Sequence, residues 1–398
     1  MMASKNVALQ SITMTQKKVL FLTLVHPVFL PPVWAMAQVL KDEGYAIHIL
    51  TFDPHLESEI FETDGVVLES VGKHHGIGLL QRLTIRRKYT ARAKQIVSEN
   101  TTAIISFCAF SYLCGLKVRN QQPIVYHALE MADFIWSSLP RSPLSQINNF
   151  LALQKVHRAS LVSTPSAQRS AWLAGRCKLS FLPETVQNTN YVPSVVTTNY
   201  SEIIKKLVPE QHLNKTALLY MGSVNPLNCV AELVEAFCKI KNEQTVLLIA
   251  GMKDNKYCNE IKQYAASQGG TNCILFYPYI TGVEKEALQQ YASIGISLTK
   301  ENKADIESKM TAPNKAGEYL AKKLYLIGTE TEYMRQFKFS GVASLVSSPT
   351  TENITTAINE SLTIATSGHY KNKIEDMVNS TYSMQQQMKP ITNLLKQL

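Results

Sequence analysis

The sequence predicts an α/β fold of two Rossmann-like, doubly wound domains that face each other across a cleft. The 398-residue chain is longer than one hydrophobic core usually supports. Short apolar runs of strand length alternate with segments long enough for helices. This alternation stops at a polar stretch from Gln187 to Asn214 and then starts again. We therefore predict domains at 17–190 and 215–370, joined by a linker at 191–214.

The first domain begins with the apolar run Lys17–Val25, as a parallel strand buried on both faces requires. Pro31 and Pro32 can occupy the first turn of the following helix, and Gly44 can end it. Residues 1–16 lack the apolar centre of a signal peptide, and we expect them to be disordered. The other expected strands are Ala46–Thr51, Gly65–Val71, Ala103–Phe107, Ile124–Ala128 and Leu161–Thr164.

The second domain repeats the pattern with six further apolar runs. The segment 371–398 has helical composition without another strand, so we expect a helical tail that docks on one domain or crosses back to the other. The expected strands are Ala217–Met221, Thr245–Ala250, Cys273–Tyr277, Ile294–Leu298, Leu324–Gly328 and Val342–Val346.

Composition bounds the location and the partners of the chain. A hydrophobic fraction of 45% with 18% charged residues is ordinary for a globular enzyme. No apolar run approaches the ~20 residues that span a bilayer, so we expect a cytoplasmic protein. The net charge of +9 can attract an anionic nucleotide, a nucleic acid or an acidic membrane surface. Of these partners, we predict no nucleic acid.

A basic segment at 82–94 is expected to form a helix. Its pattern fits the surface of an anionic membrane at the inner face of the cell, and a solvated helix face is the other interpretation. The basic residues are Arg82, Arg86, Arg87, Lys88, Arg92 and Lys94.

Ligands of open α/β sheets bind beyond the carboxyl ends of the strands, so the residues that follow each strand are candidates. Gly222 and Ser223 follow the first strand of the second domain, where a glycine turn lets backbone N–H groups approach a phosphate. Turn geometry alone would also explain the glycine. Later in the domain a helix is expected to open near Pro313 and to carry Asn314 and Glu318 on one face.

That second segment supplies charges of both signs. Lys315 can neutralise a diphosphate, and Glu318 can accept hydrogen bonds from ribose hydroxyls. Ordinary capping of a solvated helix is the alternative. In the first domain, His127 lies at the end of the fifth strand, Glu130 follows that strand, and His26 lies in the first β-α turn. They can contact a sugar or deprotonate an acceptor, although strand-end histidines are often structural.

Two other signals point away from cofactors. Gly76 and Gly78 follow a strand without the third glycine of a dinucleotide fingerprint, which disfavours a nicotinamide cofactor. Asp305 and Glu307 form one acidic pair, and no His/Cys cluster has zinc spacing. We therefore predict neither a cofactor nor a required metal.

The order of several segments resembles the retaining glycosyltransferases of family four, which have two Rossmann-like domains in the arrangement called GT-B. The segments are LLYMGSVNP, TVLLIAGMKD, ILFYPYITGVEKEALQQYASIGISL and APNKAGEYLAKKLYLIGT, between Leu218 and Thr329. The resemblance implies transfer of a sugar from a UDP- or GDP-linked donor to a glycan or lipid-linked acceptor, with retention, in bacterial-type surface polysaccharide synthesis.

The resemblance also assigns roles to individual positions. It places Gly222 and Ser223 at the donor phosphates, Tyr279 and Ile280 beside the base, and Glu318 at the ribose. It places His127 beside the donor sugar.

The sequence departs from the family pattern at several positions. Ser223 and Asn228 replace a usual arginine and lysine, and Met310 replaces the first of two glutamates. Lys309 and Lys315 can supply positive charge in their place. A nucleotide-sugar epimerase of the same fold and a degenerate transferase acting as a binding subunit remain the alternatives.

Overall fold

A computed structural model describes residues 16–52, 60–63, 65–73, 78–98, 100–129, 143–193, 199–240, 242–300, 310 and 312–398. Residues 1–15, most of the segment expected to be disordered, lie outside the described part of the chain. The described residues divide into two compact units. The first holds the residues up to His26, those from Ala37 to Val162, and Ile391–Leu398; the second holds Pro27–Met36 and Ser163–Pro390.

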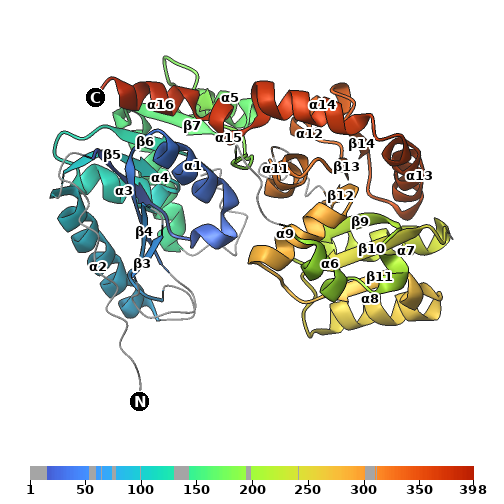
Figure 1. Ribbon diagram of the computed structural model, residues 1–398. Coiled ribbons are helices and arrows are strands. Elements are labelled where there is room, and N and C mark those ends of the chain that lie inside the picture. Colours follow the sequence, from blue (N-terminus) through green and yellow to red (C-terminus); the bar gives the residue numbers. More distant parts are fainter. Residues whose placement is uncertain are drawn as a thin grey trace. The chain divides into compact units, whose positions relative to one another are not determined.

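The first sheet has eight strands in the order β3-β4-β2-β1-β5-β6-β7-β8 (Figure 1). The apolar runs form its centre because parallel strands are buried on both faces; Val19 to Leu22 of β1 are fully buried. The strands are β1 (Lys18–Leu22), β2 (Ala46–Thr51), β3 (Ile60–Thr63), β4 (Val66–Ser70), β5 (Thr101–Ser106), β6 (Ile124–His127), β7 (Leu161–Thr164) and β8 (Glu184–Thr185).

The two outermost strands were not expected from the sequence. β3 pairs with β4 in the antiparallel direction, and β8 has two residues. Both lie at sheet edges, where strands are short and carry little of the buried apolar pattern by which strands are found.

The second sheet has six strands in the order β11-β10-β9-β12-β13-β14, and neighbouring strands run parallel. This is the 3-2-1-4-5-6 order of a doubly wound sheet, whose order reverses between β9 and β12. All six strands were expected. They are β9 (Thr216–Met221), β10 (Thr245–Ala250), β11 (Ile274–Tyr277), β12 (Ile294–Ser297), β13 (Tyr325–Thr329) and β14 (Ala343–Val346).

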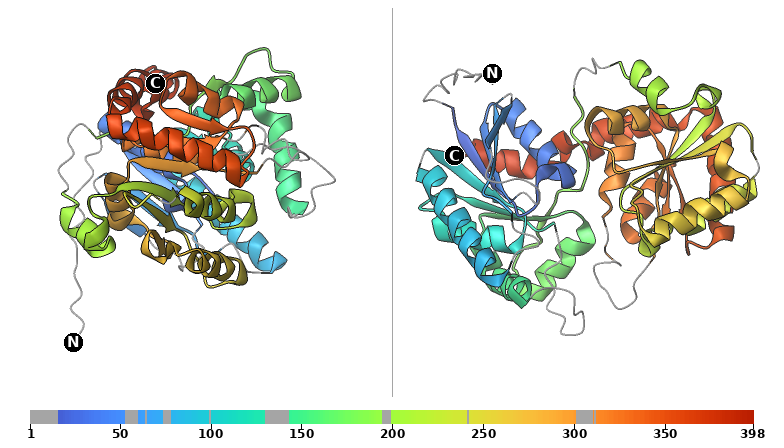
Figure 2. Two further views of the ribbon diagram at one scale, coloured as in Figure 1. Left: turned by 90° about the vertical axis from the view of Figure 1, so that its right-hand side faces the viewer. Right: turned by 90° about the horizontal axis from the view of Figure 1, so that it is seen from below.

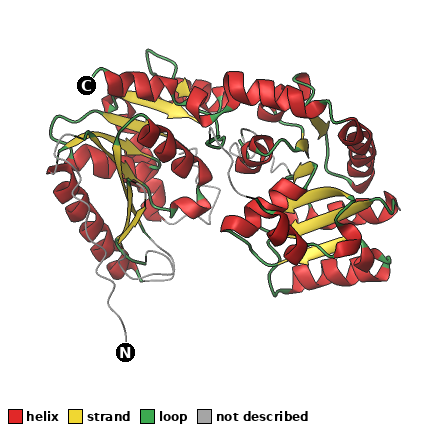
Figure 3. Cartoon of the chain, in the orientation of Figure 1, coloured by secondary structure: helices red, strands yellow, loops and turns green. Residues whose placement is uncertain are grey.

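Helices flank the strands of each sheet (Figures 2 and 3). Helix α7 shows the amphipathic spacing that fixes such packing: Val230, Leu233, Val234 and Phe237 are buried. The helices up to β8 are α1 (Pro31–Asp42), α2 (Leu79–Ser98), α3 (Ala109–Val118), α4 (Pro143–Lys155) and α5 (Ala167–Cys177). Those after it are α6 (Ser201–Leu207), α7 (Val230–Ile240), α8 (Lys256–Ser267), α9 (Gly282–Tyr291), α11 (Asn314–Ala321), α12 (Glu332–Phe339), α13 (Thr351–Ser367), α14 (Tyr370–Met377), α15 (Met384–Gln387) and α16 (Lys389–Lys396).

Two helical regions bear on the expected domain plan. Helix α6 lies within the segment 191–214 that was expected to link the domains. The tail 371–398 contains α14, α15 and α16, and its last eight residues belong to the first unit. There Lys396 Nζ lies 2.7 Å from Glu43 Oε2.

Candidate functional site

The carboxyl edge of the second sheet carries two glycines that allow its loops to pass closely. Gly222 follows β9 with a φ of +134°, and its N–H donates to the carbonyl of Ala250 over 3.0 Å. Gly251 follows β10 with a φ of +120°, and a Cβ there would lie 1.8 Å from the Gly222 carbonyl oxygen. A side chain at residue 251 would therefore displace the turn that contains Gly222.

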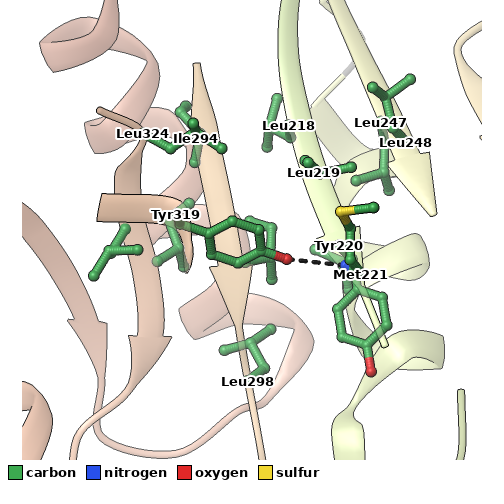
Figure 4. Close-up of a cluster of buried hydrophobic side chains, with 14 of the residues drawn as sticks. Leu218, Leu219, Tyr220, Met221, Leu247, Leu248, Ile294, Leu298, Tyr319 and Leu324 are labelled. Carbon is green, nitrogen blue, oxygen red and sulfur yellow. Dashed lines mark hydrogen bonds between the residues drawn. The ribbon is translucent and has the colours of Figure 1, made fainter. Parts of the chain in front are cut away.

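Tyr319 fixes helix α11 to the end of β9. Its side chain is fully buried, and its hydroxyl accepts a hydrogen bond of 2.9 Å from the N–H of Met221 (Figure 4). The ring lies over Gly295 of β12, where an added Cβ would approach ring carbons to 2.4 Å. Helix α11 is thus anchored at the switch point of the sheet, where ligands of doubly wound folds bind.

The anchored helix places Lys315 beside Gly222. A Cβ on Gly222 would lie 3.0 Å from Lys315 Cε and 3.4 Å from its Nζ. The ammonium also lies over the ring of Tyr220, 4.2 Å from the centroid, a favourable cation–π distance. Burial lowers the pKa of Lys315 to about 8, although the negative charge of Glu318 acts in the opposite direction.

Ser223 completes this turn through its backbone. Its carbonyl accepts hydrogen bonds from the Tyr220 hydroxyl and the Asn228 amide, each over 2.7 Å. The Asn225 amide donates to its hydroxyl over 3.2 Å. The structure therefore brings Lys315 to the turn that holds Gly222 and the exposed Ser223. Asn228, one of the residues that replaces a usual cation, acts as a structural donor to the turn.

Glu318 lies one turn further along α11 and is 8% exposed. Its Oε2 lies 2.6 Å from Lys285 Nζ and accepts from Gln289 Nε2 over 3.2 Å. Lys285 and Gln289 belong to α9, which follows the loop with Tyr279 and Ile280. Burial, and after it the charge of Glu318, raise the pKa of Tyr279 in this loop.

The remaining predicted donor residues have the following positions. Tyr279 is 53% exposed and Ile280 is buried at 9%. Asn314 is the first residue of α11 and is partly buried, one turn from Glu318. Lys309 lies outside the described residues.

The predicted catalytic residues follow strands of the first sheet. His127 ends β6, is buried, and packs edge-on against Phe107 with 5.9 Å between ring centroids. His26 follows β1 and is partly buried. Since β1, β5 and β6 run parallel, the carboxyl ends of β1 and β6 lie at the same edge of this sheet, and both histidines occupy that edge. Glu130 lies outside the described residues.

Two residues of the predicted basic surface on α2 also contact groups within the protein, and the membrane contact itself stays a prediction. Arg92 Nε donates to Glu69 Oε1 over 2.6 Å, and His48 Nε2 lies 2.9 Å from Glu69 Oε2. Burial would raise the pKa of Glu69, but these two hydrogen bonds outweigh it and hold the pKa at about 2. Arg86 lies 4.6 Å from the ring centroid of Phe110.

The other basic residues of α2 differ in exposure. Arg82 is partly buried, whereas Arg87, Lys88 and Lys94 are exposed. Within the described ranges, no helix combines the length and apolarity that crossing a membrane requires. The same described residues contain no group of three or more His, Cys, Asp or Glu side chains that could hold a metal ion. The independence from metal stays a prediction.

Comparisons with known proteins identify the fold. No protein-family model matches the chain, and no curated protein matches it. Sucrose-phosphate synthase from Thermosynechococcus elongatus superposes with a TM-score of 0.68 at 13% identity, covering 96% of this chain and 99% of that one. Anabaena HepE, solved with UDP and glucose, gives 0.66 at 15% identity over 96% and 100% of the chains. The chain has the GT-B fold.

A glycosyltransferase from Rickettsia africae shares this GT-B fold, with a TM-score of 0.67 at 14% identity over 96% and 98% of the chains. A putative UDP-N-acetylglucosamine 2-epimerase from Listeria monocytogenes also shares it, with a TM-score of 0.61 at 14% identity over 96% of each chain. The predicted pair of Rossmann-like domains is confirmed. Identities of this size establish the fold alone.

Sequence reasoning missed the residues that support this site. Gly251 carried a signal, a glycine directly after an expected strand, as Gly222 does. Lys285 and Gln289 carried none, because only the packing of α9 against α11 reveals that they reach Glu318.

Proposed function

We propose that the chain is a glycosyltransferase that binds a UDP- or GDP-linked sugar at the carboxyl edge of its second sheet. The observation that carries the proposal is the presentation of Lys315 and Glu318 by one anchored helix, next to the glycine turn at Gly222. A cation beside backbone N–H groups suits a diphosphate, and a carboxylate one turn away suits ribose hydroxyls. Structures of one similar protein, Anabaena HepE, with UDP and glucose and with UDP-glucose support the choice of ligand.

Each residue has a distinct task in this mechanism. The Lys315 ammonium neutralises the diphosphate, whose negative charge grows as the bond to the sugar breaks. Glu318 holds the ribose, and the loop with Tyr279 and Ile280 faces the base. His127 contacts the sugar, while His26 and Glu130 orient or deprotonate the acceptor hydroxyl. Such a site acts by positioning and charge stabilisation, and we propose transfer with retention.

The acceptor is proposed to be a glycan or a lipid-linked sugar of surface polysaccharide synthesis. Arg87, Lys88 and Lys94 expose positive charge on α2, and Leu80 of the same helix is 79% exposed. Cations beside an apolar side chain favour peripheral contact with an anionic bilayer. Sedimentation with vesicles of 30% phosphatidylserine tests this: a triple Glu variant of the three cations should lose binding, and equal binding would contradict the contact.

A thermal-shift screen of UDP, GDP and their sugars tests the donor site. We expect a nucleotide-dependent rise in Tm for the wild type that Glu318→Ala largely loses. Glu286→Ala is the matched control, since Glu286 also accepts from a lysine, Lys322 Nζ at 3.3 Å. An unchanged shift in Glu318→Ala would remove Glu318 from the site.

Turnover separates the alternatives. An epimerase, which the Listeria structure brings to attention, would convert the donor without any acceptor. A binding subunit would show the thermal shift and no turnover with any acceptor tested. A transferase releases nucleoside diphosphate in proportion to the sugar gained by the acceptor.

A further inference from the structure

The carboxylate of Glu318 has two oxygens with different environments. Lys285 Nζ and Gln289 Nε2 both contact Oε2. Oε1 has no hydrogen-bond partner among the described residues and is not among the atoms sealed from solvent without a partner. The protein thus holds one oxygen of this carboxylate and leaves the other to accept from a ligand.

Both donors come from one face of α9. Lys285 and Gln289 are four residues apart, which places their side chains on neighbouring turns of the same face. Gln289 is 2% exposed, and the Lys285 side chain is 27% exposed. The contact is therefore largely buried between the two helices, whereas most lysine–glutamate pairs among the described residues lie at the surface, as at Lys205 and Glu202.

The same helix begins directly after the loop that carries Tyr279 and Ile280. Helix α9 therefore connects the loop expected to face the base with the carboxylate expected to bind the ribose. A carboxylate with a free rotamer could turn away from a ligand, and two donors on one oxygen prevent this rotation. Charge-assisted bonds to lysine are strong enough to fix it.

We propose that Lys285, assisted by Gln289, is a positioning residue that fixes Glu318 so that Oε1 reads the ribose hydroxyls and rejects a deoxyribose donor. This inference rests on the proposed function and adds to it the origin of ribose selectivity. A site built to hydrogen-bond a hydroxyl discriminates against an analogue that lacks it because its polar group is then left unpaired.

Calorimetric titration with UDP, GDP and their 2′-deoxy and 3′-deoxy forms tests the inference. We expect the wild type to prefer a ribonucleotide at least about tenfold over the deoxy form that removes the contacted hydroxyl. Lys285→Met should bind the ribonucleotide about tenfold more weakly and lose the preference, and Lys285→Arg should restore part of it. Gln289→Met, which keeps the buried volume, should lose part of the preference and serves if Lys285→Met fails to fold.

Lys322→Met is the matched control. Lys322 is similarly exposed at 23% and pairs with Glu286 of the same helix α9, so its loss perturbs the region without touching Glu318. An unchanged ribose preference in Lys285→Met, or an equal loss in Lys322→Met, would overturn the positioning role and leave the proposed function standing. A wild type that binds none of the nucleotides would overturn both.

Discussion

Lys315 should make donor binding depend on pH in the neutral to weakly alkaline range. Its pKa is lowered to about 8, chiefly by burial, and only the protonated form can neutralise a diphosphate. With that pKa the amine is about nine-tenths protonated at pH 7 and about one-tenth protonated at pH 9. If the diphosphate binds the ammonium form, the affinity for UDP-glucose should fall about tenfold over this interval.

Three titratable groups around the Gly222 turn have pKa values above this range. Burial raises the pKa of Cys229 to about 12, and burial raises that of Tyr220 as well. Burial also raises the pKa of Tyr319 well above its ordinary value. Isothermal titration of UDP-glucose at pH 7, 8 and 9, in buffers of matched ionic strength, therefore reports mainly on Lys315.

Two variants test whether the Lys315 ammonium contacts the diphosphate. Lys315→Arg keeps a charge throughout, so its affinity should stay constant between pH 7 and 9 apart from any titration of the base. Lys315→Met should bind more weakly at pH 7 and show the same flat profile. A wild-type profile as flat as that of Lys315→Met would show that the ammonium does not contact the diphosphate.

Three further predictions concern the frame of the molecule, each measured as the free energy of unfolding in urea. Gly251→Ala should destabilise by more than about 2 kcal/mol, because the new Cβ would meet the Gly222 carbonyl at 1.8 Å; a loss within about 0.5 kcal/mol would refute the close approach. Tyr319→Phe should cost about 1–2 kcal/mol by leaving the Met221 N–H unsatisfied, and an unchanged stability would mean that water replaces the hydroxyl. Since the pKa of Glu69 is lowered to about 2, its contribution to the free energy of unfolding is present above about pH 4.5 and is lost as the pH falls toward 2. Glu69→Gln should therefore reduce the loss of stability between about pH 4.5 and 2. An unchanged loss of stability in this variant would assign it to other carboxyl groups.

The sequence predicts the strands well where burial on both faces leaves a continuous apolar run. β2 and β10 begin and end at the expected residues. It fails at the edges, since β3 and β8 are too short and too polar to carry such a run. It also left α6 inside an expected linker, because α6 has no buried residue that would set a helical apolar pattern.

The site could be predicted only as far as single elements carry it. Lys315 and Glu318 belong to one short helix, so their spacing in the sequence predicts that they lie close together. The partners of Glu318 on α9 lie 29 and 33 residues earlier in the chain, and no local pattern encodes that distance. The basic residues of α2 show the same limit: their pattern predicts a charged face, whereas the hydrogen bond of Arg92 to Glu69 spans 23 residues of sequence and depends on packing.

The placement of α11 explains why a partly buried lysine is kept at this edge. Tyr319 fastens the helix to β9, and Gly317 lets it approach residues 188 and 189 so closely that a Cβ would come within 2.4 Å of the Asn188 carbonyl. Because both sides of the helix are fixed, Lys315 stays beside Gly222, where burial disfavours its charge. An anionic ligand reverses that balance by supplying the counter-charge. Because burial disfavours the free ammonium, the site should bind anions selectively. This selectivity depends on the two contacts that hold α11 in place.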